Sequence, residues 1–344
     1  MLLVLVGVAG CNFDQSIERR EVIELLPGYA KFLADHDVWE CETRGWIYQF
    51  GNRSKAAKFI VNEWAEGRSD DVRERAVERV RRFFVDKESE KPIPLRVGDY
   101  VCPMVLTDGD GYFEVRHSVP SENLAEWLKP GAVRRAPYDV ILPKGDRRKF
   151  VGAIDLIDPQ GLSVISVIDD TLRLAEVGDS KKVIENTILM EYEPVPGMAS
   201  LYQAWAARRG AVFHYVSGSP LQMFPVIGEF LERHRFPAGS MHLRPYSILS
   251  GSKIPPAAPF KMLVIERILA DFPERKFIFV GDSGEDDPEM YGELARTHLK
   301  QVERILIRVV DHGRKASDER FRQAFTGLPR SLWLTFEHAD QVVR

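Results

Sequence analysis

The chain has 344 residues, 44% hydrophobic and 28% charged, which is typical of a globular protein with enough core for two domains. Its net charge of −4 argues against a nucleic-acid partner, because such proteins carry a basic excess. Its three cysteines, Cys11, Cys41 and Cys102, are too widely spaced to suggest a disulfide framework or a cysteine metal site. No apolar run reaches the roughly 20 residues that span a bilayer.

Residues 1–20 are interpreted as a leader. The stretch MLLVLVGVAGC is apolar and ends in small residues before Cys11, like the end of a bacterial lipoprotein signal. This hypothesis predicts cleavage before Cys11 and a lipid anchor on its thiol. The stretch is short for a signal and lacks a basic segment, so an N-terminal strand or an unstructured leader are the alternatives. Localisation stays open between a cytoplasmic protein and one anchored to a membrane through Cys11.

Residues 21–160 are predicted to form a β-rich domain. The segment 38–50 is rich in β-forming residues and contains Gly45, which indicates a strand with a bulge or a close backbone approach. Further short strand-like runs, separated by turn signals, cover 100–119 and 136–158. This spacing favours a small β-sandwich.

An amphipathic helix is predicted over residues 69–85, because apolar residues recur there at helical spacing. Its other face carries five arginines interleaved with Glu74 and Glu78. A basic helix of this kind can contact anionic lipid, which makes a membrane surface one candidate partner. The interspersed acids favour the alternative, a solvated outer face.

From residue 161 to 344 the pattern becomes that of an α/β domain. Continuous apolar runs alternate with helical segments, which indicates a parallel sheet covered by helices on both faces. The runs are 162–168, 211–216, 276–280 and 304–310, and the helices cover about 197–209, 222–235, 261–271 and 317–325. A connector at 247–260, rich in Gly, Pro and Ser, is typical of loops over active sites.

Polar residues follow these runs, where parallel sheets bind their ligands. The set is Asp169, Asp170 and Thr171 after the first run, Ser217 after the second, Lys261 at a helix start, and Asp282, Asp286 and Asp287 after the third. Carboxylates gather a hard cation such as Mg²⁺, while hydroxyl, lysine and backbone N–H groups hold a phosphoryl group. An aspartate can also serve as nucleophile. Individually, Asp170 and Ser217 also fit ordinary turn residues, and Lys261 a solvated one.

The stretches VIDDTLRLAEV, VPGMASLYQAW, FHYVSGSPLQMFPVIGEFLERHRFPAGSMHLR, FPERKFIFVGDSGEDDPEMYGEL and ILIRVV occur in this order within residues 161–310. They resemble the catalytic domain of the actin-patch-associated phosphatidate phosphatase family, in the haloacid dehalogenase-like superfamily. ELLPGYAKF and TDGDGYF, farther upstream, resemble the β-rich domain of bacterial relatives. The resemblance implies a Rossmann-like parallel sheet, a Mg²⁺-dependent phosphatase of lipid metabolism, and phosphatidate or another small phosphomonoester as substrate.

The resemblance also implies roles for individual residues. Asp169 matches the general acid/base and a metal ligand, and Thr171 matches the threonine of the same motif. Ser217 and Lys261 match the groups that hold the phosphoryl group. The metal ligands beside Asp169 match Asp282 and Asp287, with Asp286 close enough in sequence to be confused with the latter.

One position departs from the family pattern. The aspartate that serves as nucleophile and metal ligand falls on Val167, and valine offers neither charge nor lone pair. Three explanations compete: a pseudophosphatase that binds phospholipid or a protein partner without catalysis, an altered or misread copy of an active enzyme, and a different nucleophile such as water activated by Asp169. Loss of such a group typically costs on the order of 10⁴ or more in rate.

Overall fold

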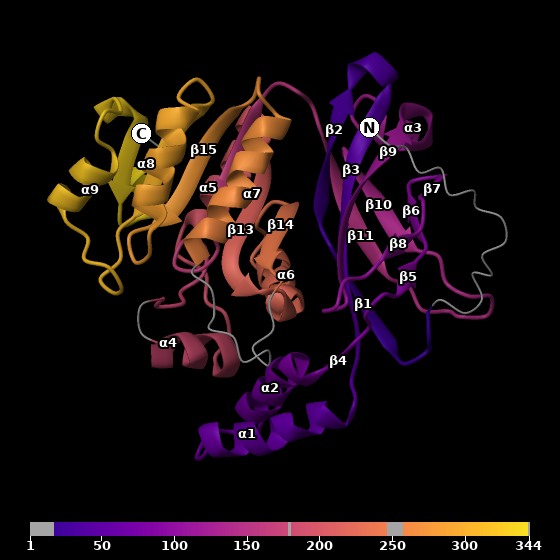
Figure 1. The fold of residues 1–344 in the computed structure, drawn as a ribbon. Helices are drawn as coiled ribbons and strands as arrows, with labels where there is room; N and C mark the ends of the chain where they lie inside the picture. The colour runs from indigo at the N-terminus through magenta and orange to yellow at the C-terminus, as the bar shows by residue number, and fades with distance from the viewer. Residues whose placement is uncertain (1–16, 178–179, 246–256, 343–344) are drawn as a thin grey trace.

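The computed structural model describes residues 17–177, 180–245 and 257–342, and it contains two separate sheets, A and C (Figure 1). The VAGC stretch with Cys11 and most of the 247–260 connector lie outside the described residues. A search of the described residues finds no helix with the length and apolar character that a bilayer span requires.

Sheet A has nine strands, all between Glu21 and Ile157. They are β1 (Glu21–Leu26), β2 (Gly28–Leu33), β3 (Val38–Gln49), β4 (Asp86–Lys87), β6 (Leu95–Val97), β7 (Tyr100–Val101), β9 (Tyr112–Pro120), β10 (Arg135–Val140) and β11 (Val151–Ile157). Two more strands, β5 (Pro92–Ile93) and β8 (Val105–Leu106), pair with each other, and α3 (Ala125–Leu128) follows β9. The long β3 pairs with β1 and β2 along one edge and with β9 and β4 along the other.

The expected sandwich is built from this one continuous sheet. Phe113 of β9 and Leu95 of β6 share a core cluster although their strands are far apart in the sheet order, so the sheet folds back on itself. Gly45 in β3 permits a close approach rather than a bulge, because a Cβ there would lie 2.6 Å from the Phe113 ring and the register with β9 is unbroken.

A helical hairpin interrupts sheet A between β3 and β4. Its helices, α1 (Ala56–Trp64) and α2 (Asp70–Arg81), lie beyond the carboxyl ends of the sheet C strands (Figure 1). Buried residues of both helices form a small core with Ile188 and Leu189 of the second domain. The amino-terminal half of the chain therefore covers part of the other domain.

The arginines of α2 have a role that neither sequence interpretation foresaw. Arg79 is buried and donates to the carbonyl oxygens of Thr187 at 2.9 Å and Met190 at 2.6 Å. Arg82 donates to the Glu24 carboxylate of sheet A at 3.0 Å. Arg79 of α2 and Arg82, which directly follows it, thus tie the hairpin to both domains, whereas the side chains of Arg73 and Arg81 are 41% and 38% exposed.

Sheet C is parallel throughout, as the apolar runs predicted, with the order β14-β13-β12-β15-β16-β17. Its strands are β12 (Leu162–Ser166), β13 (Val212–Pro220), β14 (Gly239–Arg244), β15 (Lys276–Asp282), β16 (Val302–Arg308) and β17 (Trp333–Phe336). Its helices are α4 (Ser180–Ile184), α5 (Met198–Arg209), α6 (Phe224–Arg233), α7 (Ala257–Asp271), α8 (Asp287–Thr297) and α9 (Asp318–Ala324). The chain runs outward from β12 in both directions, so the strand order reverses between β12 and β15, where such sheets form their ligand crevice.

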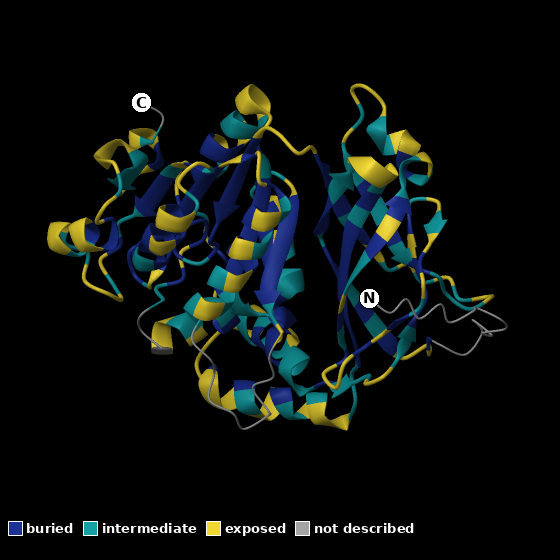
Figure 2. Cartoon of the chain, turned by 45° about the horizontal axis from the view of Figure 1, so that its top comes forward, coloured by how far each residue is buried: buried dark blue, intermediate teal, exposed yellow. Residues whose placement is uncertain are grey.

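Helices cover both faces of sheet C, and the strands between them are buried (Figure 2). Residues of α5 and α6 pack on one face, and residues of α7, α8 and α9 pack on the other. The boundary predicted near residue 160 falls between the last strand of sheet A and the first strand of sheet C.

The two domains are docked through Asp271 at the end of α7. Its carboxylate accepts hydrogen bonds from the Tyr29 hydroxyl at 2.6 Å and the Lys31 ammonium at 2.7 Å, and it also pairs with Arg116. Burial alone would raise the pKa of Asp271, but hydrogen bonds from these three partners lower it to about 2.

We expect Asp271→Asn to lower the free energy of unfolding by about 2–4 kcal/mol, because the buried Tyr29 and the partly exposed Lys31 and Arg116 lose a charged acceptor. Since the folded pKa is depressed, this stabilisation is present above about pH 4 and is lost as the pH falls toward 2. Chemical denaturation at pH 7 and pH 3 measures both effects, with the exposed Asp35→Asn as control. Equal losses for the two variants at pH 7 would contradict the interface role.

Candidate functional site

Asp169 lies just beyond the carboxyl end of β12, and every hydrogen bond of its carboxylate is made inside the chain. One oxygen accepts from Arg173 Nε at 2.5 Å, and the other accepts from Ser217 Oγ at 3.0 Å and Ser219 Oγ at 2.7 Å. Burial would raise the pKa of Asp169, but the Arg173 charge and the two serine hydroxyls outweigh it and lower the pKa. Ser217 of β13 therefore meets Asp169, as the resemblance predicted.

Asp170 is a turn residue. Its backbone adopts the left-handed conformation with φ of 54°, which aspartate tolerates better than most residues. Its carboxylate accepts hydrogen bonds from the backbone N–H groups of Ala175, Glu176 and Val177, and from His312 Nε2 at 2.8 Å. The side chain thus closes the loop after β12.

A second group of charges forms on the α7 side of β15. Lys261 Nζ lies 2.8 Å from an Asp287 carboxylate oxygen and 2.8 Å from Glu285. Asp282 is next to them, because its backbone N–H donates to Asp287 at 3.2 Å, and its carboxylate is 3.5 Å from Thr171 Oγ1. Lys261 is buried and paired, so the solvated alternative for this residue is wrong.

The charges of this second group shift one another's proton affinities. Burial and the neighbouring Asp287 charge raise the pKa of Asp282 well above its usual value, against the opposing effect of Lys261. Burial would lower the pKa of Lys261, but the surrounding carboxylates raise it well above its usual value. A buried pair of carboxylates with one ammonium is an arrangement in which a further cation would be favourable.

Val167 is buried in the apolar cluster that sheet C shares with α7 and α8. Ile165 belongs to the same cluster, as expected for two residues on one face of a strand, and the Val167 backbone N–H still bonds Val280 of β15 at 3.0 Å. Lys261 lies on α7 one turn before Val264 and Ile265, which belong to the same apolar cluster. The side chain of Val167 therefore lies on the same side of the sheet as Lys261 and Asp287.

The predicted metal ligands do not meet at one point. The Asp169 carboxylate forms an ion pair with Arg173 and accepts hydrogen bonds from two serines. The half-exposed Asp286, at the start of α8, forms an ion pair with Arg314. In the described ranges there is no group of three or more His, Cys, Asp or Glu side chains that could hold a metal ion. Of the four predicted ligands, Asp282 and Asp287 are the two that the structure brings together.

Arg173, which the sequence did not single out, is the residue on which Asp169 depends. Its guanidinium lies 3.9 Å from the centre of the Tyr192 ring, and Arg79 of α2 lies 4.7 Å from the same centre. Two cations thus face one buried aromatic ring, a favourable contact for each. The hairpin, Tyr192 and Arg173 form a continuous chain of contacts that ends at Asp169.

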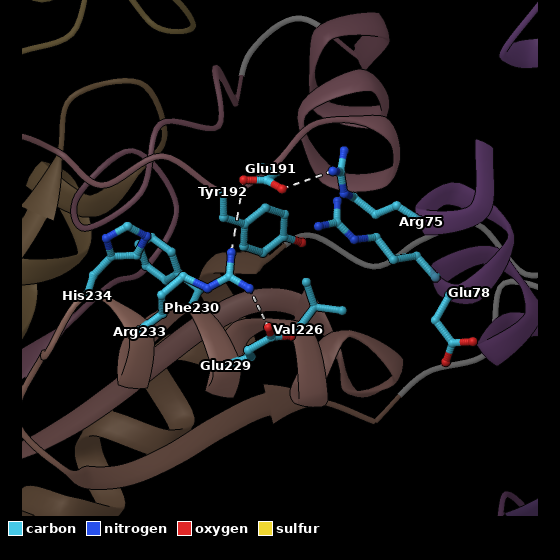
Figure 3. A pocket seen from close by; sticks show the side chains of 10 residues that line it. Arg75, Glu78, Glu191, Tyr192, Val226, Glu229, Phe230, Arg233 and His234 are labelled. Carbon is cyan, nitrogen blue, oxygen red and sulfur yellow. Dashed lines mark hydrogen bonds and ion pairs between the residues drawn. The ribbon is translucent and has the colours of Figure 1, made fainter. Parts of the chain in front are cut away.

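The Tyr192 ring also lines a cavity of about 200 Å³ between α2, α6 and the segment before α5 (Figure 3). Arg75 reaches Glu191 across it at 2.9 Å, and Arg233 pairs with Glu229 at 2.5 Å. Basic and acidic side chains alternate around the cavity, so it has no strong preference for an anion or a cation.

Ser219 and Arg173 were both missed in the sequence analysis, although the sequence contains a signal for each. Ser219 is two positions after Ser217 on a strand, so both side chains point the same way. Arg173 is four positions after Asp169, a spacing at which opposite charges pair in a helical turn. Each signal is common in proteins, which is why neither one was informative alone.

We expect Arg173→Met to lower the free energy of unfolding by about 3–5 kcal/mol, because it leaves a buried carboxylate without its cation. The Arg173 side chain is 2% exposed and that of Asp169 is 13% exposed. Adding Asp169→Asn should recover part of the loss, a coupling that a double-mutant cycle in urea measures. The more exposed Arg233→Met should cost about 0.5 kcal/mol or less. Strictly additive effects of the Arg173 and Asp169 changes would contradict the pairing.

The comparisons with known proteins bear on this part of the chain. Residues 162–309 match the family described as "Phosphatidate phosphatase APP1, catalytic domain". The chain is 35% identical over 156 residues to the phosphatidate phosphatase APP1 of Saccharomyces cerevisiae, covering 44% of this chain and 26% of that protein. It is 26% identical over 238 residues to an uncharacterized protein, C29B5.04c, of Schizosaccharomyces pombe, covering 67% of this chain and 37% of that one.

The chain thus spans about a third of the length of these curated relatives. Among solved structures, a chain of the Pnkp1/Rnl/Hen1 complex matches with a TM-score of 0.31 and 14% identity, covering 52% of this chain and 58% of that one, a likeness too low to carry an argument. By sequence, residues 162–309 therefore carry the resemblance that their motifs predicted, to the catalytic domain of the phosphatidate phosphatase APP1 family.

Proposed function

We propose that this protein has a phosphomonoester-binding site of the phosphatidate phosphatase type, in which hydrolysis is impaired because Val167 occupies the position of the nucleophile. The observation that carries the proposal is the position of Val167 at the end of β12, on the side of the sheet from which Lys261 and Asp287 come. We also propose that sheet C is of the haloacid dehalogenase-like type, with lipid phosphates such as phosphatidate as the substrate class.

Phosphate binding is supported by the residues at the strand ends. Lys261 supplies a permanent positive charge, and the hydroxyls of Ser217 and Thr171 can turn toward a phosphoryl oxygen when one is present. The backbone N–H groups of the loop after β15 precede α8, whose amino-terminal end favours an anion. These groups bind and orient a phosphoryl group, and none of them can form a bond to phosphorus.

This chain lacks the group that would start the family's reaction. With an aspartate at position 167, a carboxylate oxygen could attack phosphorus, forming an aspartyl-phosphate while the bond from phosphorus to the leaving oxygen breaks. Asp169 would protonate that leaving oxygen and later take a proton from the water that hydrolyses the aspartyl-phosphate. The isopropyl group of Val167 has no atom that can make the first bond.

Mg²⁺ is the cation that we propose for this site, and the residues present fit it in part. Asp282 and Asp287 are two adjacent oxygen ligands of the kind that Mg²⁺ prefers, and the raised pKa of Asp282 marks a place where added positive charge is favourable. The family's third carboxylate is missing at Val167, and Asp169 is bonded elsewhere. When bound, the ion would neutralise phosphoryl charge, and no step above passes through it.

Val167→Asp is expected to raise phosphate release from phosphatidate and from a chromogenic phosphomonoester by about 10⁴-fold or more, with added Mg²⁺. Val167→Asn, which matches aspartate in size but cannot form the covalent intermediate, should stay at the level of the unmodified chain. Thermal melting of all three proteins checks that the buried substitution is tolerated. If the unmodified chain released phosphate as fast as Val167→Asp, both the proposed impairment and the non-catalytic alternative would be contradicted.

A further inference from the structure

Helix α1 exposes two aromatic side chains that the fold does not use. Phe59 is 79% exposed and Trp64 is 51% exposed, whereas Ala57, Val61 and Ala65 are fully buried against α2. At 100° per residue, Phe59 projects almost opposite to the buried residues. An aromatic side chain in this position adds nothing to the stability of the helix and costs free energy in water.

The amino-terminal half of the same surface is basic. Arg53, Lys55 and Lys58 are exposed, and within the described ranges none of them forms an ion pair. Glu63, four residues after Phe59, lies on the same side of the helix as Phe59, and Glu66 follows the end of α1. Phe59 is thus flanked by cations on the side toward the start of α1, a composition typical of helices that lie in a membrane interface.

This surface is at the same end of the molecule as the candidate site. The hairpin lies beyond the carboxyl ends of the sheet C strands (Figure 1), and an ion pair from Arg68 to Glu185 ties the end of α1 to the segment after β12. The neighbouring Ile184 and Met190 are also exposed apolar residues. A flat surface in contact with α1 would therefore lie near the strand ends that carry Asp169.

We propose that α1 docks this protein on an anionic phospholipid surface, with Phe59 inserted among the lipids and Arg53, Lys55 and Lys58 on the lipid phosphates. The charge of the flanking residues favours an anionic partner. The exposed apolar area of a nine-residue helix is far below the roughly 800 Å² per partner of a stable protein dimer, which argues against a second copy. Trp64 lies about 140° around the helix from Phe59 and near the buried Ala57, so the lipid contact consists of one inserted ring and three cations, which supports weak, reversible membrane binding.

The docking does not depend on catalysis. It assigns the lipid contact to α1 instead of the basic face of α2, where Arg79 is engaged within the chain. If the proposed function holds, a docked molecule would also take its lipid phosphates from the same surface; this consequence alone rests on the proposed function.

Co-sedimentation of the full chain with vesicles tests the proposal. We use phosphatidylcholine vesicles with and without phosphatidylserine, neither of which carries a phosphomonoester, so the result is independent of phosphatase activity. The unmodified chain should bind the anionic vesicles and lose binding in high salt. Phe59→Ser should bind at least about tenfold more weakly, since burying one such ring changes an equilibrium constant by roughly ten- to a hundredfold.

The control is Val133→Ser, at an apolar residue that is 78% exposed on another part of the surface, and it should bind like the unmodified chain. Lys55→Gln with Lys58→Gln should weaken binding to the anionic vesicles and leave binding to neutral ones unchanged. Thermal melting confirms that each variant is folded. Unchanged binding by Phe59→Ser would overturn the proposal, and so would a dimer in gel filtration that Phe59→Ser converts to a monomer without any vesicle binding.

Discussion

The site is organised by the need of buried charges for partners. Lys261, Asp282 and Asp287 are taken out of water by α7, β15 and α8, and each of them would be costly there alone. The ion pair of Lys261 with Asp287 fixes the start of α8 against α7, which in turn holds the loop after β15 beside the end of β12. Asp169 is held in the same way by Arg173 on the other side of β12. The strand ends are therefore prearranged by charge pairing, and a ligand need only displace or join these pairs.

Val167 is an apolar residue among these paired charges. For packing, valine at the end of β12 is a good choice, because its neighbours in the cluster are aliphatic and aromatic side chains of α7 and α8. For chemistry, the same side chain removes one negative charge from beside Lys261. Lys261 pairs with Asp287 and Glu285, and its single positive charge does not balance all of the carboxylates around it, which include Asp282. Under the proposed function, the charge pairs of Lys261 and Asp169 would hold the binding site in place without a nucleophile at position 167.

The sequence predicted the parallel sheet because its central strands are continuous apolar runs, a strong signal. It also placed Asp169, Ser217 and Asp287 at strand ends of one parallel sheet, which share an edge, but it did not predict the pairs of Asp169 with Ser217 and of Lys261 with Asp287. The edge strand β17 was missed because it has only four residues, and the edge strand β14 because it begins with Gly239 and Ser240, which are weak strand formers. The helix α1 was missed because its buried face is made of small residues, two alanines and a valine, which give a weak periodic signal. Nothing local in the sequence shows that this hairpin crosses to the other domain, which depends on contacts more than 100 residues apart.

The central claim is that Val167 leaves this chain without the nucleophile that forms an aspartyl-phosphate. It is tested most directly by acid-quenching the protein with a phosphomonoester and Mg²⁺ and measuring the mass of the peptide that contains residues 163–174. The account predicts no added phosphoryl group on this peptide in the unmodified chain, and a phosphoryl group at position 167 in Val167→Asp. A phosphoryl group on Asp169 or Asp170 of the unmodified chain would contradict it.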